Sequence, residues 1–234
     1  MKKALLTLVT IMLCRTISAD DNALLYKAFL CSDMSVWHDF IETNENCNEP
    51  NRLILLLDIE YNYLAWASQQ NITDNQDILY IFNRHIKQYS TSKHNKSYLN
   101  TLYSAYYLYN MFINRQNYIK NAMKSIDYAT KSLENPHPLA LMHCGFMYFY
   151  RPTWAGGSKT KALSYLQQAE YIFQQNGDFT ANWDYLNLQM HIAQCLWKLG
   201  KKEEALAKCN SILEQEPNFN YVREELIREV RSEK

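Results

Sequence analysis

Histidine and cysteine side chains have the most reactive spacing in this chain. His191 and Cys195 are four residues apart, which places them on one face of a helix, and Cys144 directly follows His143. Two such pairs on neighbouring helices would supply the four nitrogen and sulfur ligands that structural zinc takes. Adjacent helical residues, however, point about 100° apart, which places His143 and Cys144 poorly for binding one ion. We therefore expect core histidines with hydrogen-bond partners, and no metal or other cofactor.

Other patterns that could support catalysis are weaker. The segment Gly157-Ser158-Lys159-Thr160 ends like a phosphate-binding loop, but Ser158 separates glycine from lysine and Thr153 stands where the motif requires its first glycine. The acidic pairs Glu203-Glu204 and Glu224-Glu225 fit the solvated starts and faces of helices. The sequence contains no HExxH or GxGxxG motif and no signature of a serine or cysteine nucleophile. We predict that the protein is not an enzyme.

Composition narrows the fold class to helical proteins. The 234 residues include only five Gly and five Pro, against 18 Tyr, nine Phe and five Trp. All-β folds need a turn about every 8–12 residues, and disordered chains lack aromatic side chains, so both classes are excluded. The chain is also long enough to bury a core. We predict an all-α protein of one domain.

The first 19 residues have the build of a secretory signal peptide. Two lysines follow the initial Met, an apolar run extends from Ala4 to Leu13, and Ala19 is a small residue at the expected cleavage point. Ten apolar residues rise only about 15 Å as a helix, which is too short to span a bilayer. We predict that residues 1–19 are cleaved. The mature domain, residues 20–234, would then be exported, either periplasmic or secreted, and would not span a membrane.

Cleavage changes the charge and the cysteine count. The chain has 24 basic and 24 acidic residues, and loss of the leader leaves 21 basic against 24 acidic. Phosphate binding needs a concentrated basic face, and the only cationic run is at Lys198, Lys201 and Lys202, so we predict no nucleic-acid partner. Five cysteines remain in the mature domain: Cys31, Cys47, Cys144, Cys195 and Cys209. An odd number leaves at least one thiol free, and Cys31 with Cys47 is the better candidate for a bridge, with the connectivity otherwise open.

Internal similarity recurs with a period of 40 residues. Ala122, Ile126 and Ala129 match Ala162, Leu166 and Ala169, and Ala105 matches Gly145 at the same shift. Small residues let two helix axes approach to about 8–10 Å, so the pattern indicates closely packed antiparallel helices. A glycine inside a helix costs about 1 kcal/mol relative to alanine, and we therefore expect close packing at Gly145.

The periodicity and its punctuation predict eleven helices, the last of which caps the final repeat. Gly177 and Gly200 are expected to end helices. The predicted helices cover residues 22–30, 34–44, 50–70, 74–89, 96–114, 117–134, 138–150, 159–176, 182–199, 202–215 and 219–232.

The segment from Leu188 to Pro217 resembles a tetratricopeptide repeat. The resemblance rests on Ala193, Leu199-Gly200, Glu204-Ala205 and Pro217, and it departs from the pattern at Cys209 and Ile212. Segments 99–134 and 139–176 resemble the same repeat with a longer turn, and segment 59–89 does so more faintly. The stretch from Cys144 to Tyr148, with Gly156-Gly157 and Lys161-Ala162, is also similar to Sel1-like repeats. The resemblance implies a right-handed α-solenoid of helical hairpins with a C-terminal capping helix and a concave binding groove.

The first helix of each hairpin faces the concave side in such repeats. The residues that this implies for the groove are Tyr106, Tyr109, Met142, Phe146, Phe149, Met190, Gln194 and Trp197. They follow the spacing of one helical face, which is equally compatible with core packing between hairpins. Trp154, in the turn from Arg151 to Ser158, is either a contact on a loop or a ring that folds back over the hairpin.

These observations predict a binding protein. Aromatic and Met side chains give large, adaptable contact area, so we expect a non-catalytic adaptor or scaffold that binds a protein or peptide in an aromatic groove. The alternative is a periplasmic accessory subunit of a transport system that binds a small apolar ligand. The Gly156-Gly157 turn is similar to the one in periplasmic helical-repeat subunits of that kind.

Overall fold

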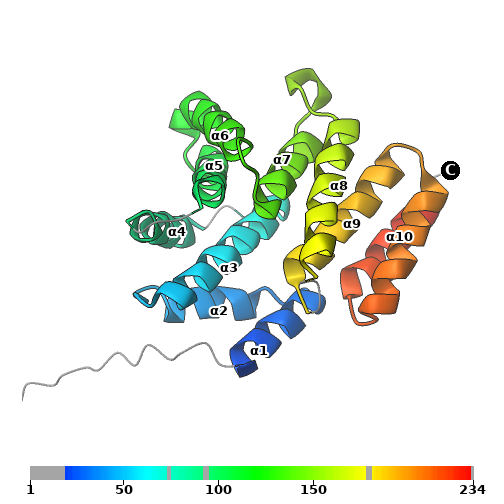
Figure 1. Cartoon of the computed structure of the whole chain (residues 1–234), viewed down its shortest axis with the longest axis horizontal. Coiled ribbons are helices and arrows are strands. Elements are labelled where there is room, and N and C mark those ends of the chain that lie inside the picture. Colours follow the sequence, from blue (N-terminus) through cyan, green and yellow to red (C-terminus); the bar gives the residue numbers. More distant parts are fainter. Residues whose placement is uncertain (1–18, 73–74, 92–94, 178–180, 233–234) are drawn as a thin grey trace, which may run out of the picture.

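The computed structural model describes residues 19–72, 75–91, 95–177 and 181–232, and these residues form helices joined by turns, without a strand (Figure 1). The helices are α1 (Ala19–Leu30), α2 (Ser35–Thr43), α3 (Pro50–Gln69), α4 (Gln76–Tyr89), α5 (Lys96–Ile113), α6 (Tyr118–Ser132), α7 (Pro138–Tyr150), α8 (Lys159–Asn176), α9 (Trp183–Lys198), α10 (Lys202–Gln215) and α11 (Ile227–Ser232). Short 3₁₀ segments, η1 (Arg115–Asn117) and η2 (Thr153–Ala155), follow α5 and α7. Residues 1–18 of the expected signal peptide lie outside the described residues.

All the predicted helices are present, and their ends differ from the prediction by at most three residues. Local side chains explain this agreement. The Asn95 side chain accepts hydrogen bonds from the backbone N–H groups of Ser97 and Tyr98 at the start of α5. At the C-terminal ends of helices, Gly177 and Gly200 follow α8 and α9 with φ of 69° and 77°, as predicted for helix-ending glycines.

The last predicted helix, 219–232, is divided in two. Its first part, η3 (Tyr221–Leu226), winds as a π-helix and continues directly into α11. Val222, Leu226 and Val230 are fully buried on one side of this segment, so it covers the end of the helical stack in the way expected of a capping helix.

Consecutive helices pack as antiparallel pairs, most extensively α5 with α6, α7 with α8 and α9 with α10. The close packing predicted at Gly145 is confirmed, because a Cβ atom there would lie 2.7 Å from Cδ2 of Leu166 on α8. Leu166 is itself fully buried, so it has no room to move away. The small residue therefore sets how closely α7 and α8 approach.

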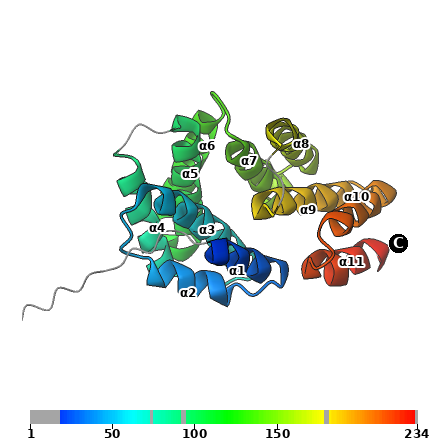
Figure 2. The same ribbon diagram turned by 60° about the horizontal axis from the view of Figure 1, so that its bottom comes forward.

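The described residues form two apolar cores, one around α1–α5 and one around α7–α11. Figure 2 shows these two groups of helices side by side. Helix α3 connects them through its polar side chains. The Tyr61 hydroxyl of α3 lies 3.2 Å from Nδ1 of His143 on α7, and Asp58 accepts a hydrogen bond from Nε1 of Trp183 on α9. Because of these contacts, α3 lies against the later hairpins as well as its own neighbours. Among the described helices, none combines the length and the apolar character needed to cross a bilayer.

Candidate functional site

The aromatic stripe predicted to line a groove lies largely inside the fold. Four of its residues are buried, Tyr109, Met142, Phe146 and Phe149, and the other four are half-buried, Tyr106, Met190, Gln194 and Trp197. The rings of Phe146 and Phe149 pack against His191 of α9, with centroid separations of 4.3 and 6.1 Å. These two side chains therefore hold α7 against α9, and a binding role for the stripe stays a prediction.

The part of the stripe on α9 meets the C-terminal segment. Nε2 of Gln194 donates a hydrogen bond of 3.0 Å to the hydroxyl of Tyr221 in η3. The Lys198 ammonium lies 3.3 Å from the centre of the Trp197 ring, which is a close cation–π contact. Nε1 of Trp197 and Oε1 of Gln194 are buried without a hydrogen-bond partner among the described residues. This end of the predicted groove is therefore partly occupied by η3.

An open pocket of about 510 Å³ lies where α3 and α5 end. It is lined from α3 by Leu64 and Ser68, from the α3–α4 turn by Ile72, and from α5 by Tyr109 and Phe112. Phe112 is 51% exposed and Ile72 39% exposed, so part of its apolar lining faces solvent. Asn71, Asn75 and Arg115 add polar groups to the lining. The pocket thus combines apolar surface with several polar groups, and it contains one of the predicted groove residues, Tyr109.

His143 takes part in a buried polar chain. Oγ of Ser104 donates to the carbonyl of Ser125 (2.8 Å) and lies 2.8 Å from Nε2 of His143, so this nitrogen carries the proton and donates to Ser104. Nδ1 then accepts from the Tyr61 hydroxyl. Burial lowers the pKa of His143 to about 4, which keeps the imidazole neutral at physiological pH. This series of hydrogen bonds connects α3, α5, α6 and α7.

His191 is held in the same manner. Nδ1 donates to the carbonyl of Asn187 (2.8 Å), and Nε2 accepts from the Tyr150 hydroxyl (2.9 Å). Burial lowers the pKa of His191 to about 4 and raises the pKa of the Cys144 and Cys195 thiols to about 12. The four residues considered for zinc are therefore two neutral histidines with both nitrogens hydrogen bonded and two protonated thiols. The histidine hydrogen bonds connect α7 and α9 to neighbouring helices, as expected of core histidines.

Two carboxyl groups face each other between α3 and α9. Asp58 and Asp184 are hydrogen bonded, and burial, followed by the charge of Asp184, raises the pKa of Asp58 well above its ordinary value. Nδ2 of Asn62 donates to Oδ1 of Asp184 (3.0 Å), and Nε1 of Trp183 donates to Oδ2 of Asp58 (2.8 Å). The raised pKa values of both groups favour one proton between them at acidic pH, and the hydrogen bonds of the pair connect two helices.

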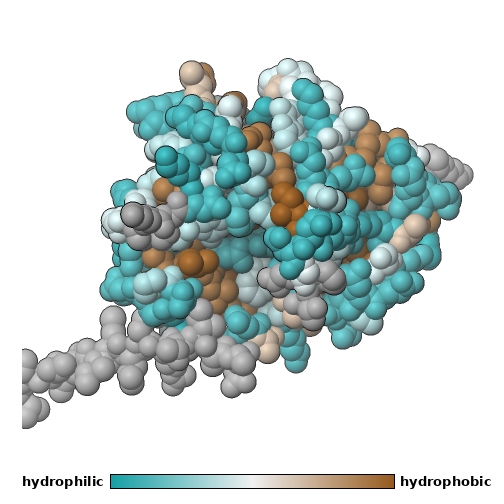
Figure 3. All heavy atoms as spheres, viewed as in Figure 1, coloured by the Kyte–Doolittle hydropathy of each residue, from teal (hydrophilic) through white to brown (hydrophobic). Residues whose placement is uncertain are grey.

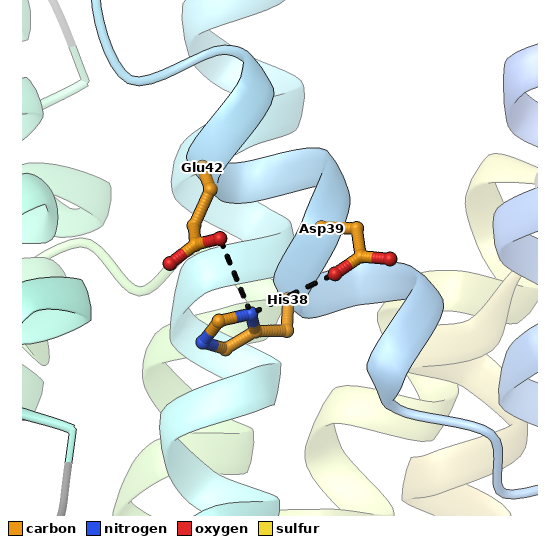
Figure 4. Close-up of side chains that lie close together, drawn as sticks. All are labelled: His38, Asp39 and Glu42. Carbon is orange, nitrogen blue, oxygen red and sulfur yellow. Dashed lines mark ion pairs between the residues drawn. The ribbon is translucent and has the colours of Figure 1, made fainter.

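A second polar cluster lies on the exposed side of α2. Nδ1 of His38 is 3.9 Å from Oδ1 of Asp39 and 3.8 Å from Oε2 of Glu42 (Figure 4). All three side chains come from one helix, and the side chains of Asp39 and Glu42 are 83% and 57% exposed. Nothing in the cluster comes from a second element. The four-residue spacing of His38 and Glu42 is common on solvated helices, and we assign this cluster to the exposed surface of α2.

The remaining residues singled out in the sequence are Trp154 and the pair Cys31 and Cys47. Trp154 is 89% exposed, so its ring does not fold back over the hairpin, and a contact role stays a prediction. Cys31 is an exposed free thiol and Cys47 is buried, so the described residues do not contain the bridge considered between them.

Sequence reasoning missed both the pocket and the Asp58–Asp184 pair. The pocket is formed by the ends of helices, where no periodic pattern extends, and Asn62 and Asp184 are 122 residues apart. The only signal for the pair in the sequence is that Asp58 lies within an otherwise apolar stretch of α3. Comparison with protein-family models and with curated proteins finds no match for this chain.

Proposed function

We propose that this chain is an exported, non-catalytic binding protein that takes up an apolar segment of a protein partner. In this proposal it is a right-handed α-solenoid of tetratricopeptide-like hairpins, closed by its C-terminal helix. The antiparallel pairing of α5–α6, α7–α8 and α9–α10 and the close α7–α8 contact at Gly145 support the repeat type.

The pocket at the ends of α3 and α5 is the observation that carries this proposal. Phe112 and Ile72 offer apolar surface at its rim, Tyr109 lies inside it, and Arg115 provides a cation beside it. A bound segment would place an apolar side chain against Phe112 and Ile72 and a polar or acidic group near Arg115. Interfaces gain most of their affinity from a few such anchor contacts.

The state of the titratable groups supports a role without catalysis. The neutral His143 and His191 each have both ring nitrogens hydrogen bonded within the protein. The carboxyl groups of Asp58 and Asp184 bond to each other and to Trp183 and Asn62. General acid–base catalysis requires a group within hydrogen-bonding reach of substrate, and the hydrogen bonds of these groups run between helices instead.

A small apolar ligand is the second candidate for this pocket, as in an accessory subunit of a transport system. The observation that favours it is the volume of about 510 Å³, which is within the range of roughly 300–1,000 Å³ typical of small-molecule sites. The two candidates differ in whether a ligand remains bound to the protein during purification. Native mass spectrometry of the purified protein would detect a retained small molecule, whereas a peptide-binding protein would be isolated empty.

Selection from a peptide display library tests the proposal without knowledge of the partner. We expect enriched peptides to share an apolar anchor and to bind the Phe112→Ala variant at least about tenfold more weakly, which corresponds to about 1.4 kcal/mol. The matched control is Tyr171→Ala, which removes an aromatic ring that is 63% exposed on α8. A failure to enrich any peptide, or peptides that bind Phe112→Ala as well as they bind the control, would contradict the proposal.

A further inference from the structure

Helix α6 presents its most apolar side to solvent. Its exposed apolar residues are Ile119, Met123 and Ile126, with exposed fractions of 74%, 68% and 46%. The residues that it buries are instead small or polar: Asn121, Ser125, Ala129 and Ser132. Surface helices normally show the reverse arrangement, with the apolar stripe toward the core. The exposed stripe on α6 therefore needs an explanation outside the fold of the single chain.

Hydrogen bonds fix this orientation of α6. Oγ of Ser104 donates to the carbonyl of Ser125, and Oγ of Ser97 donates to the carbonyl of Ser132 (2.7 Å). Both bonds join α5 to the inner side of α6 in fully buried surroundings, where a lost hydrogen bond is costly. Rotating α6 to bury its apolar stripe would break both. The outward direction of Ile119, Met123 and Ile126 is therefore a stable property of the fold.

More exposed apolar residues lie at the same end of the molecule. Ser97, at the start of α5, donates to the carbonyl of Ser132 at the end of α6 and accepts from the backbone N–H of His137 just before α7. These three helix ends therefore lie together, and the start of α6 and the end of α7 lie at the opposite end of the helices. Figure 1 shows the start of α6 and the α7–α8 turn along the upper edge, and Figure 3 shows small brown spots among teal surface in the region of α6. Tyr118 at the start of α6 is 50% exposed, and Trp154 in the α7–α8 turn is 89% exposed.

Basic residues accompany these apolar side chains. Residues 78–169 contain 11 basic and only two acidic residues, whereas the remainder of the chain contains 13 basic and 22 acidic residues. One of the two acidic residues, Asp127, is bonded to Lys131 at 2.6 Å. The zero net charge of the whole chain therefore combines a strongly cationic middle segment with anionic flanks.

The cations lie within the apolar edge itself. Arg115, Lys120 and Lys124 are exposed around the apolar residues of α6, and Lys161 is exposed in the first turn of α8, which follows the turn that carries Trp154. The Lys124 ammonium lies 4.6 Å from the centre of the Tyr107 ring, so it is held at the surface by an aromatic neighbour. The edge thus combines apolar side chains, a tryptophan at a tip and a net positive charge.

We infer that this edge, formed by α6 and the α7–α8 turn, docks on an anionic phospholipid surface. Interfacial helices combine an apolar stripe with lysine and arginine, tryptophan and tyrosine anchor at the headgroup level, and cations attract acidic lipids. A second copy of this chain is a poor occupant, because it would bring two cationic edges together. Nucleic acid would engage the cations but gains nothing from exposed Ile119 and Met123. Ile119, Met123 and Trp154 enter the headgroup region while the lysines contact lipid phosphates.

Vesicle binding by the full chain tests the inference. The probes are vesicles of phosphatidylcholine alone and vesicles of phosphatidylcholine and phosphatidylglycerol in equal parts, with cosedimentation as the measurement. We expect binding to the acidic vesicles only, weakened by salt as the charges are screened. Tryptophan emission should shift to the blue on binding, and the Trp154→Phe variant should lose most of that shift.

Two pairs of variants separate charge from apolar contact. Lys120→Glu with Lys124→Glu should weaken the partition coefficient at least about tenfold, and Ile119→Ser with Met123→Ser should do the same. The matched charge control is Arg228→Glu with Arg231→Glu on α11, which changes the net charge equally. The matched apolar control is Leu24→Ser with Tyr171→Ser, both exposed elsewhere.

Three results would overturn the inference. The first is equal binding to both kinds of vesicle, and the second is no binding to either. The third is that the α6 variants bind acidic vesicles as well as the unchanged protein does, or that the control variants lose as much binding as the α6 variants. If soluble polyglutamate displaced the protein from acidic vesicles and the apolar variants still bound, the edge would be a general polyanion contact instead. All four variants change exposed side chains, and melting curves would verify that each is folded.

Discussion

Polar side chains of α3 hold the two halves of this molecule together. Tyr61 contacts His143 of α7, while Asp58 contacts Trp183 and Asp184 of α9. Removing one partner of such a pair leaves a buried polar group unsatisfied, which costs more than the hydrogen bond contributes. The neutral state of His143 and the shared proton of the Asp58–Asp184 pair follow from burial, so both depend on the fold remaining closed.

The shared proton makes the stability of the protein depend on pH. Burial, before all other causes, raises the pKa of Asp58 and of Asp184 above the ordinary value of about 3.9. A group whose pKa is raised by folding contributes its full stability below the unfolded pKa and loses that contribution as pH rises through the folded pKa. We therefore expect the α3–α9 contact to contribute most near pH 4 and to weaken above it.

The Asp58→Asn variant tests this expectation. The new amide would donate to Asp184 and accept from Trp183 at every pH, so it imitates the protonated acid. We expect a melting temperature equal to that of the unchanged protein near pH 4, and higher near pH 8 by about 2–4 °C, on the order of 1 kcal/mol. Asp39→Asn, on the exposed face of α2, is the control. Parallel pH profiles for Asp58→Asn and the unchanged protein would show that Asp58 carries no shared proton.

Helices are the scale at which the sequence was most informative. Capping side chains such as Asn95 and helix-ending glycines such as Gly200 act within a few residues, so the ends of helices could be predicted closely. The aromatic stripe could not be assigned in this way. Residues spaced along one helical face are the same whether that face meets solvent or another helix, and His191 covers Phe146 from a helix 45 residues further along the chain.

Gly145 provides a test at the scale of one helix pair. Alanine has the better helix propensity, but its Cβ atom would lie 2.7 Å from buried Leu166, so we expect Gly145→Ala to destabilise the protein by about 1–3 kcal/mol. Gln167→Ala, on the exposed side of α8, should leave the free energy of unfolding nearly unchanged. Urea denaturation of both variants measures the difference. Equal or higher stability for Gly145→Ala would mean that α7 and α8 are not held at this distance.

The whole molecule has an arrangement that local sequence patterns do not contain. The position of α3 against α9 depends on contacts between residues more than 100 apart, such as Asn62 and Asp184. The exposed stripe of α6 follows the same helical period as a buried one, and its cations are spread over some 90 residues without forming a run. The structure brings these features to two adjoining places that share Arg115: a pocket at the ends of α3 and α5, and a cationic apolar edge along α6.

The claim that binding takes place at the pocket, and not along the aromatic stripe, is tested most directly by one paired measurement. The dissociation constant for a display-selected peptide and the melting temperature would be measured for Phe112→Ala and Phe146→Ala. We predict that Phe112→Ala weakens binding at least about tenfold at an unchanged melting temperature, whereas Phe146→Ala destabilises the fold by about 3 kcal/mol or more. Weaker binding by Phe146→Ala at an unchanged melting temperature, with Phe112→Ala unaffected, would contradict the account and place the site in the groove.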